Sequence, residues 1–154
     1  MNKHVKSRSA SRSAHKMTST KEDYLRAIFV LQEKSGEQTG ATEIARYMGL
    51  SKSTVSERLQ ELVGQKMIAP YFYSSISLTK KGAIAAKKLT YKHRIAEVFL
   101  NRVLKIPKNE VHEEAHKLEH ALSDRVTQKI AKYLGSPKQD PHGQRIPVIP
   151  NWSK

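Results

Sequence analysis

Histidine and carboxylate side chains recur at helical spacing in the second half of the sequence. Four of them fall at positions i, i+4, i+7 and i+8, and therefore share one face of a helix: His112, His116, Glu119 and His120. The preceding stretch carries His93 and Glu97, again four residues apart. Two facing helices would bring these imidazoles and carboxylates together, and such a donor set suits divalent manganese, iron, cobalt, nickel or zinc.

Two other interpretations of these side chains are open. Glu113, Glu114 and Lys117 lie nearby, so the same face is also consistent with a solvated polar surface. Catalysis is disfavoured, because the predicted donors do not form the Glu-x-x-His pairs of di-iron bundles and the sequence has no Gly-rich phosphate loop. We therefore expect a metal-binding protein that is not an enzyme.

The composition points to a polyanionic partner. The 154 residues carry a net charge of +14, and neutralising nucleic-acid phosphates with such an excess releases condensed counterions. The chain has no cysteine, which removes disulfides and thiolate ligands and fits a cytoplasmic protein. No apolar run reaches the length of a membrane span, so we expect no membrane partner.

The elements that must position these donors follow from hydrophobic periodicity and helix-cap signals. Helices are predicted from Ser19 (with Glu22 in a capping box) to Lys34, over 41–48, from Ser51 or Ser53 to Lys66, and over 80–104, 109–122 and 123–134. Between Met67 and Lys81, aromatic and β-branched residues predict two short strands around a turn at Ser74-Ser75.

The expected fold is mainly α, a winged helix-turn-helix followed by a helical dimerisation domain. A disordered basic arm is expected at 1–18, because Lys and Arg occur there without Asp or Glu and almost without large apolar residues. The DNA-binding domain would cover 19–81, the metal-binding and dimerisation domain 82–136, and a tail 137–154.

Residues 41–68 form the strongest local motif. Two short helices flank Gly49, which permits the positive φ of a tight turn, and Leu50 is expected to fill the corner between them. The second of these helices begins with small polar residues, as a recognition helix does where it enters the major groove. The predicted DNA contacts on that helix and after the strands are Ser51, Lys52, Ser53, Thr54, Ser56, Arg58 and Lys80. Lys52 and Arg58 are assigned to phosphates, which position a protein on DNA without specifying sequence.

Several of these segments together resemble the diphtheria toxin repressor family, which includes iron-dependent repressors and manganese transport regulators. The resemblance covers about 19–149 and is carried by KEDYLRAIFVLQE, the STVS of the helix-turn-helix, LTKKG, YKHRIAEVFL and HEEAHKLEHALS. It implies a homodimer that binds a double-stranded DNA operator as a repressor of metal-homeostasis genes, with Fe(II) or Mn(II) as corepressor and Zn, Co or Ni as further possibilities.

The resemblance also implies two ligand sets. The first is Asp23, His116, Glu119 and His120, and the second is His93, Glu97 and His112. Arg26 stands where the manganese type has a glutamate ligand, and its position three residues after Asp23 predicts an ion pair between the two. His142, in the expected tail, has no predicted partner.

Two further functions stay open. The first is a winged-helix regulator that binds its operator without metal, with a purely structural histidine face. The second is a nonspecific chromatin-like protein that uses the basic arm, although such a protein would not need a polar recognition helix.

Overall fold

A computed structural model describes residues 19–36, 39–71, 75–150 and 152 of the chain. Within these ranges it contains six helices and no multi-residue strand: α1 (Ser19–Ser35), α2 (Ala41–Met48), α3 (Lys52–Gly64), α4 (Lys80–Arg102), α5 (Val111–Glu119) and α6 (Asp124–Tyr133). The mainly helical class is thus confirmed, and each predicted helix is present. The basic arm expected at 1–18 lies outside the described residues. Among the described helices, none is both long and apolar enough to cross a membrane.

The helix-turn-helix forms through α2 and α3. Gly49 ends α2 with a φ of 67°, the left-handed conformation that the tight turn requires. Ser51 begins α3 and accepts a hydrogen bond from the Thr54 backbone N–H at 3.2 Å. Apolar residues of α2 and α3 are buried in a core shared with α1, but Leu50 is 41% exposed. The prediction that Leu50 fills the corner was wrong, because this side chain is largely turned to solvent.

The segment between α3 and α4 is joined to the domain by single bridges rather than by the two predicted strands. Thr39 pairs with Ile76 and Ile68 with Leu78, both antiparallel. The Ala69 N–H donates to the Ser77 carbonyl at 2.9 Å. Pro70 follows and has no N–H to continue such a ladder. Residues 72–74, with part of the predicted turn, lie outside the described residues.

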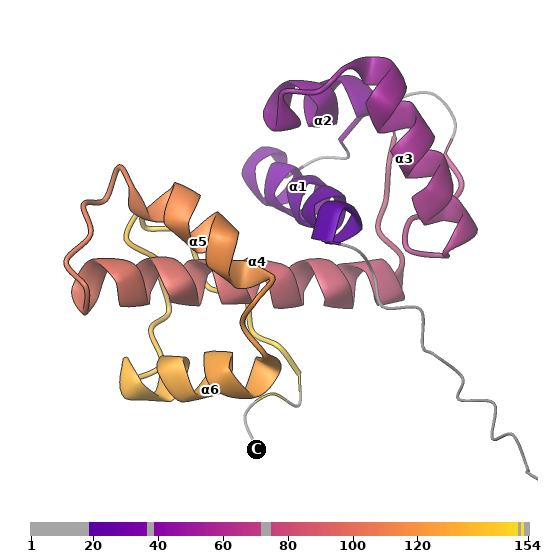
Figure 1. The fold of residues 1–154 in the computed structure, drawn as a ribbon. Helices are drawn as coiled ribbons and strands as arrows, with labels where there is room; N and C mark the ends of the chain where they lie inside the picture. Colours follow the sequence, from indigo (N-terminus) through magenta and orange to yellow (C-terminus); the bar gives the residue numbers. More distant parts are fainter. Residues whose placement is uncertain (1–18, 37–38, 72–74, 151, 153–154) are drawn as a thin grey trace, which may run out of the picture.

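Helix α4 runs between α1 and α5 on one side and α6 on the other (Figure 1). Its first half packs on α1, and Ala86 joins the core of the DNA-binding half. Its second half carries two further apolar clusters on different sides, one with α5 through Ala96 and Leu100, and one with α6 through Ile95 and Val98. One continuous helix therefore contributes to all three cores and contacts α1, α5 and α6.

The segment after residue 136, expected as a tail, packs back onto α4. Ile146 lies in the cluster between α4 and α6, and Ile149 is also buried. The Arg94 guanidinium of α4 donates to Gln144 Oε1 at 3.0 Å and to the Arg145 carbonyl oxygen. Arg94 also binds Glu33 of α1 at 2.7 Å. The segment is therefore tied to the body of the protein through a buried arginine.

Candidate metal centre

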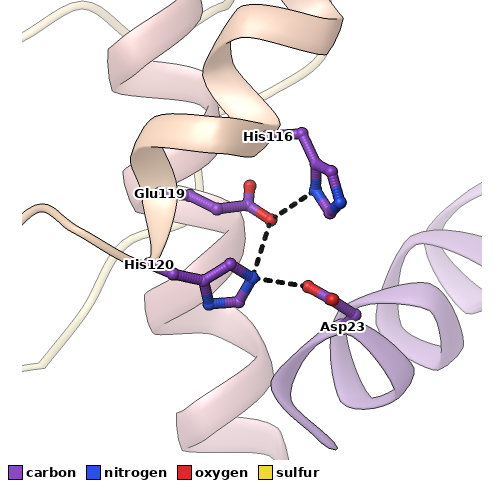
Figure 2. A group of neighbouring side chains, drawn as sticks. All are labelled: Asp23, His116, Glu119 and His120. Atoms are coloured by element: carbon purple, nitrogen blue, oxygen red, sulfur yellow. Dashed lines mark hydrogen bonds and ion pairs between the residues drawn. The ribbon is translucent and has the colours of Figure 1, made fainter. Parts of the chain in front are cut away.

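Four predicted ligands from two parts of the chain meet at the junction of α1 and α5. Asp23 projects from the second turn of α1, while His116, Glu119 and His120 project from the end of α5 (Figure 2). One donor atom from each lies within 4.8 Å of the others. His120 Nε2 is 2.7 Å from Asp23 Oδ1 and 3.5 Å from Glu119 Oε1, and His116 Nδ1 is 2.9 Å from the same Glu119 oxygen. We call these four residues the first donor group.

Glu119 is the buried centre of the first donor group. Its side chain has no exposed surface. Burial alone would raise the pKa of Glu119, but the hydrogen bond from His93 and the charge of Arg26 outweigh it and hold this pKa below its usual value. The carboxylate is therefore ionised and available to a cation.

The second predicted set, His93, Glu97 and His112, also converges and is called the second donor group. Glu97 Oε1 lies 3.0 Å from His93 Nε2 and 3.0 Å from His112 Nδ1. Burial would raise the pKa of Glu97, but the hydrogen bonds to His112 and His93 prevail and keep it well below its usual value. A cavity of about 320 Å³ reaches this group, so an ion has access to it.

His93, a member of the second donor group, also contacts the first. Its Nε2 faces Glu97 in the second group, while its Nδ1 lies 2.6 Å from Glu119 Oε2 in the first. The ring is 2% exposed. The two donor groups are thus neighbours that share one buried imidazole.

The C-terminal segment adds donors that the sequence did not reveal. Asp140 and His142 form a third cluster with Glu97, and His142 Nδ1 lies 3.8 Å from Glu97 Oε1. The Asp140 side chain also accepts from the backbone N–H groups of His142 and Gln144, which fixes this loop. The Asp-Pro-His order was the only local signal, since the partner Glu97 is more than forty residues away.

Glu22 was assigned only to a helix cap, yet it contacts His120 of the first donor group. Its Oε2 lies 2.9 Å from His120 Nδ1. Burial alone would lower the pKa of His120, but the hydrogen bonds to Glu22 and Asp23 raise it above its usual value. The imidazole ring is therefore held between two carboxylates of α1, and its protonated form is favoured in the metal-free protein.

Arg26 faces Glu119 rather than its predicted partner Asp23. Its Nε lies 3.9 Å from Glu119 Oε2 and has no hydrogen-bond partner within the described part of the chain. The residue is only 8% exposed. Arg26 thus places a fixed positive charge beside Glu119 of the first donor group. A glutamate at this position would instead place a negative charge there.

Residues 112–116 read His-Glu-Glu-Ala-His, the spacing of the zinc-hydrolase motif. In that motif two histidines bind one ion and the glutamate acts as a base. Here His112 belongs to the second donor group and His116 to the first. The Glu113 side chain is 82% exposed and pairs with Lys117 at 3.6 Å. The helix therefore divides the two histidines between different sites and leaves the glutamate in solvent.

The predicted DNA contacts lie together at the start of α3. Ser51, Lys52, Ser53 and Thr54 are exposed there, and Lys80 is exposed at the start of α4. The Ser51 hydroxyl is engaged in the helix cap, at 2.8 Å from Thr54 Oγ1 and 3.0 Å from Ser53 Oγ. Ser56 and Arg58 are half-buried, and Arg58 is paired with Glu61 at 3.0 Å. A phosphate contact by Arg58 would have to compete with this ion pair.

Comparisons with known proteins fall into one pattern. Residues 16–68 match the family "Iron dependent repressor, N-terminal DNA binding domain", and residues 79–148 match "Iron dependent repressor, metal binding and dimerisation domain". The iron-dependent repressor IdeR of Mycobacterium tuberculosis is 33% identical over 135 residues, which is 88% of this chain and 58% of that protein. An uncharacterised helix-turn-helix transcriptional regulator of Methanocaldococcus jannaschii is 32% identical over 120 residues, 77% of this chain and 94% of the relative.

Solved structures agree with these relatives. A manganese-dependent transcriptional repressor in complex with manganese superposes with a TM-score of 0.77 at 38% identity, over 83% of this chain and 58% of that one. The manganese regulator SloR gives a TM-score of 0.75 at 41% identity, over 86% of this chain and 61% of that one. The chain thus spans a little under two thirds of the length of these longer proteins.

Proposed function

Since the chain belongs to the iron-dependent repressor family, we propose that it is a dimeric, cytoplasmic, DNA-binding transcriptional repressor controlled by a divalent transition metal. The observation that carries this proposal is the composition of the first donor group. Asp23 comes from α1 in the DNA-binding half, whereas His116, Glu119 and His120 come from the other half. A ligand held by all four fixes the position of α1, and with it the helix-turn-helix, relative to the rest of the molecule.

We propose a division into two domains. Residues 19–81 form the proposed DNA-binding domain, whose core cluster also takes in Ala86 of α4. The metal-binding and dimerisation domain begins at residue 82, and we extend it beyond 136. Ile146 packs with α4 and α6, and the second matched family region reaches residue 148. The region 1–18 is proposed as a basic arm that contacts DNA phosphates.

The donor sets fit a divalent transition metal. Both proposed sites offer imidazole nitrogens and carboxylate oxygens with no thiolate, a combination that suits Fe(II), Mn(II), Co, Ni or Zn but not soft Cu(I). A bound ion would supply positive charge at the point where carboxylates of α1 and α5 approach each other. Arg26 already supplies one fixed positive charge beside Glu119, so we propose one ion in the first group and a second in the His93 group.

The residues of the first donor group suggest how metal binding would affect the DNA-binding half. In the metal-free protein His120 is drawn to Glu22 and Asp23, so a proton holds α1 against α5. His120 must release this proton from Nε2 to act as a ligand. An ion pair that depends on pH is then replaced by a metal ion that both parts of the chain bind. By linkage, metal and DNA each raise the affinity of the protein for the other if they favour the same arrangement, typically by about 1–3 kcal/mol.

The metal-independent regulator remains a second candidate because of the same contacts. The ion pairs of His120 already join α1 to the end of α5 without a metal. A protein held in its DNA-binding form by these pairs would bind its operator in the presence of a chelator. The two candidates therefore differ in one measurable property.

The deciding experiment measures DNA affinity with and without metal. Duplexes are selected from a random library by the full chain, separately with Mn²⁺ and with a chelator, and affinities are compared across Mn, Fe, Co, Ni and Zn. We expect metal to raise affinity about 5- to 150-fold in the wild type and in Glu113→Gln, an exposed control on α5. Asp23→Asn should lose this response. Equal affinity in chelator and metal would refute metal control and support the second candidate.

A further inference from the structure

A cavity far from the donor groups lies between α6, α4 and the C-terminal segment. It has a volume of about 580 Å³, within the usual range for small-ligand sites, and no residue of the three donor clusters lines it. Its walls include Tyr91 of α4, Trp152, and three cationic residues of α6. The proposed repressor activity uses none of these side chains.

The cations form one uncompensated row on α6. Arg125, Lys129 and Lys132 stand at i, i+4 and i+7 and share a helix face. All three are exposed, and none makes an ion pair within the described residues. Asp124, the one acid of α6, is already bound to Lys88 at 3.1 Å and to Lys92 at 2.9 Å. The row therefore presents positive charge that no carboxylate of the helix neutralises.

The opposite wall is aromatic. The rings of Tyr91 and Trp152 meet edge to face with centroids 5.2 Å apart. Lys88 Nζ lies 5.2 Å from the Trp152 ring centroid and adds a cation–π contact that holds the indole. Burial raises the pKa of Tyr91, so its hydroxyl is neutral near pH 7 and does not repel an anion. A flat ring can pack on this wall while an anionic group reaches the cations of α6.

We propose that this cavity binds a small anion that carries a planar ring, of the mononucleotide class. The cations of α6 would hold the phosphate through charge-assisted hydrogen bonds, and Trp152 and Tyr91 would contact the base. An aromatic carboxylate has the same two chemical features and is the other source of such a ligand. The site would let a metabolite act on the same protein independently of metal.

Trp152 is the single tryptophan of the chain, so its fluorescence reports directly on this cavity. The full-length, metal-free protein is titrated with adenosine monophosphate, with adenosine, with inorganic phosphate and with benzoate. We expect saturable quenching by adenosine monophosphate, about tenfold tighter than by adenosine or phosphate alone, because each of those lacks one of the two contacts. Tighter binding of benzoate would identify the ligand as an aromatic carboxylate and keep the site.

Variants distinguish binding in this cavity from nonspecific attraction of an anion to a basic protein. Lys129→Gln and Lys132→Gln remove exposed charges and should each weaken binding by roughly three- to tenfold. Lys117→Gln on α5 removes another exposed lysine, outside the cavity, and should leave binding unchanged. The proposal is overturned by an unsaturable signal, by equal affinity for phosphate alone, by equal weakening in the Lys117 variant, or by binding that requires a single-stranded oligonucleotide.

Discussion

The shared imidazole of His93 makes the proposed metal sites interdependent in a way that can be measured. Its Nε2 lies 3.0 Å from both Glu97 Oε1 and His112 Nδ1, and its Nδ1 lies 2.6 Å from Glu119 Oε2. If Nε2 ligates an ion in the second donor group, the one proton of the neutral ring must sit on Nδ1. That N–H then donates to Glu119 and leaves the other Glu119 oxygen free for the first donor group.

We predict that His93→Gln damages both sites, although His93 is a ligand in only one. Loss of an outer hydrogen-bond partner typically costs about 10- to 100-fold in metal affinity, equivalent to about 1.4–2.7 kcal/mol. The first donor group should weaken by this amount and the second should lose its ion. His112→Gln is the matched control, because it removes a second-group ligand that is largely exposed and makes no contact with Glu119.

The assay is calorimetric titration of Mn²⁺ and Zn²⁺ into each full-length variant near neutral pH, with urea unfolding as a check that both remain folded. Both variants should bind one ion fewer than the wild type. The affinity of the remaining ion should be close to wild type in His112→Gln and reduced in His93→Gln. Equal affinities for that ion in the two folded variants would show that the bond to Glu119 does not tune the first site.

Three further predictions concern packing, a buried charge and pH. A Cβ on Gly82 would lie 1.9 Å from the Met67 carbonyl oxygen, so Gly82→Ala should destabilise by about 1–3 kcal/mol in urea unfolding, whereas Gly64→Ala, with open space, should not. Arg94→Met should cost about 3–5 kcal/mol in the same assay, since it leaves a buried carboxylate beside it without its cation. Because the pKa of His120 is raised, the metal affinity measured by calorimetry should begin to fall as pH decreases while still above about 6.5, the value for a free histidine; a decline that starts only below that value would contradict the role given to Glu22.

Local patterns predicted the helices well because each helix buries a periodic face, and α3, α4 and α6 also begin at a side-chain cap. Ser51 and Ser123 accept backbone hydrogen bonds at the predicted starts of α3 and α6, and Thr79, which was not predicted as a cap, does the same for α4. The pairing of the two predicted strands could not be predicted from local patterns. Aromatic and β-branched residues favoured strands, and Ile68 and Ile76 do form antiparallel bridges, but pairing depends on partners such as Thr39, which lies far away in sequence. Propensity therefore predicted the conformation and not the extent of the ladder.

The donor groups were predicted to the extent that their members share a helix. His116, Glu119 and His120 follow from spacing, while Asp23 required the family resemblance. A contact between single residues of distant segments produces no repeating pattern in the sequence, so it could not be predicted in this way. Arg26 illustrates the limit, since spacing along α1 favoured Asp23 as its partner whereas tertiary packing turns it towards Glu119.

The C-terminal segment was misjudged for a related reason. Its Pro and Gly content is typical of a tail, and nothing in its own sequence announces that Asp140 and Ile146 are buried. Asp140 is buried beside Arg94, which lies next to His93 on α4, supplies a cation for Asp140 and donates to the Arg145 carbonyl, whereas Ile146 packs in the apolar cluster between α4 and α6. An isolated buried carboxylate would be strongly disfavoured without that partner.

His93 and Arg94, which are consecutive residues of α4, thus bind different parts of one layer of buried ionisable groups. His93 faces α5 and the donor groups, while Arg94 binds Glu33 of α1 and the C-terminal segment. Ionisable groups buried to this degree are stable only when paired, and removal of a single partner costs more than replacement of a whole pair by apolar residues. The layer is therefore sensitive to any change in the charge at its centre, at Glu97 and Glu119. A site in which a divalent ion takes the place of the proton on His120 uses that sensitivity, because α4, which carries His93 and Glu97, also anchors α1 and the helix-turn-helix packed on it.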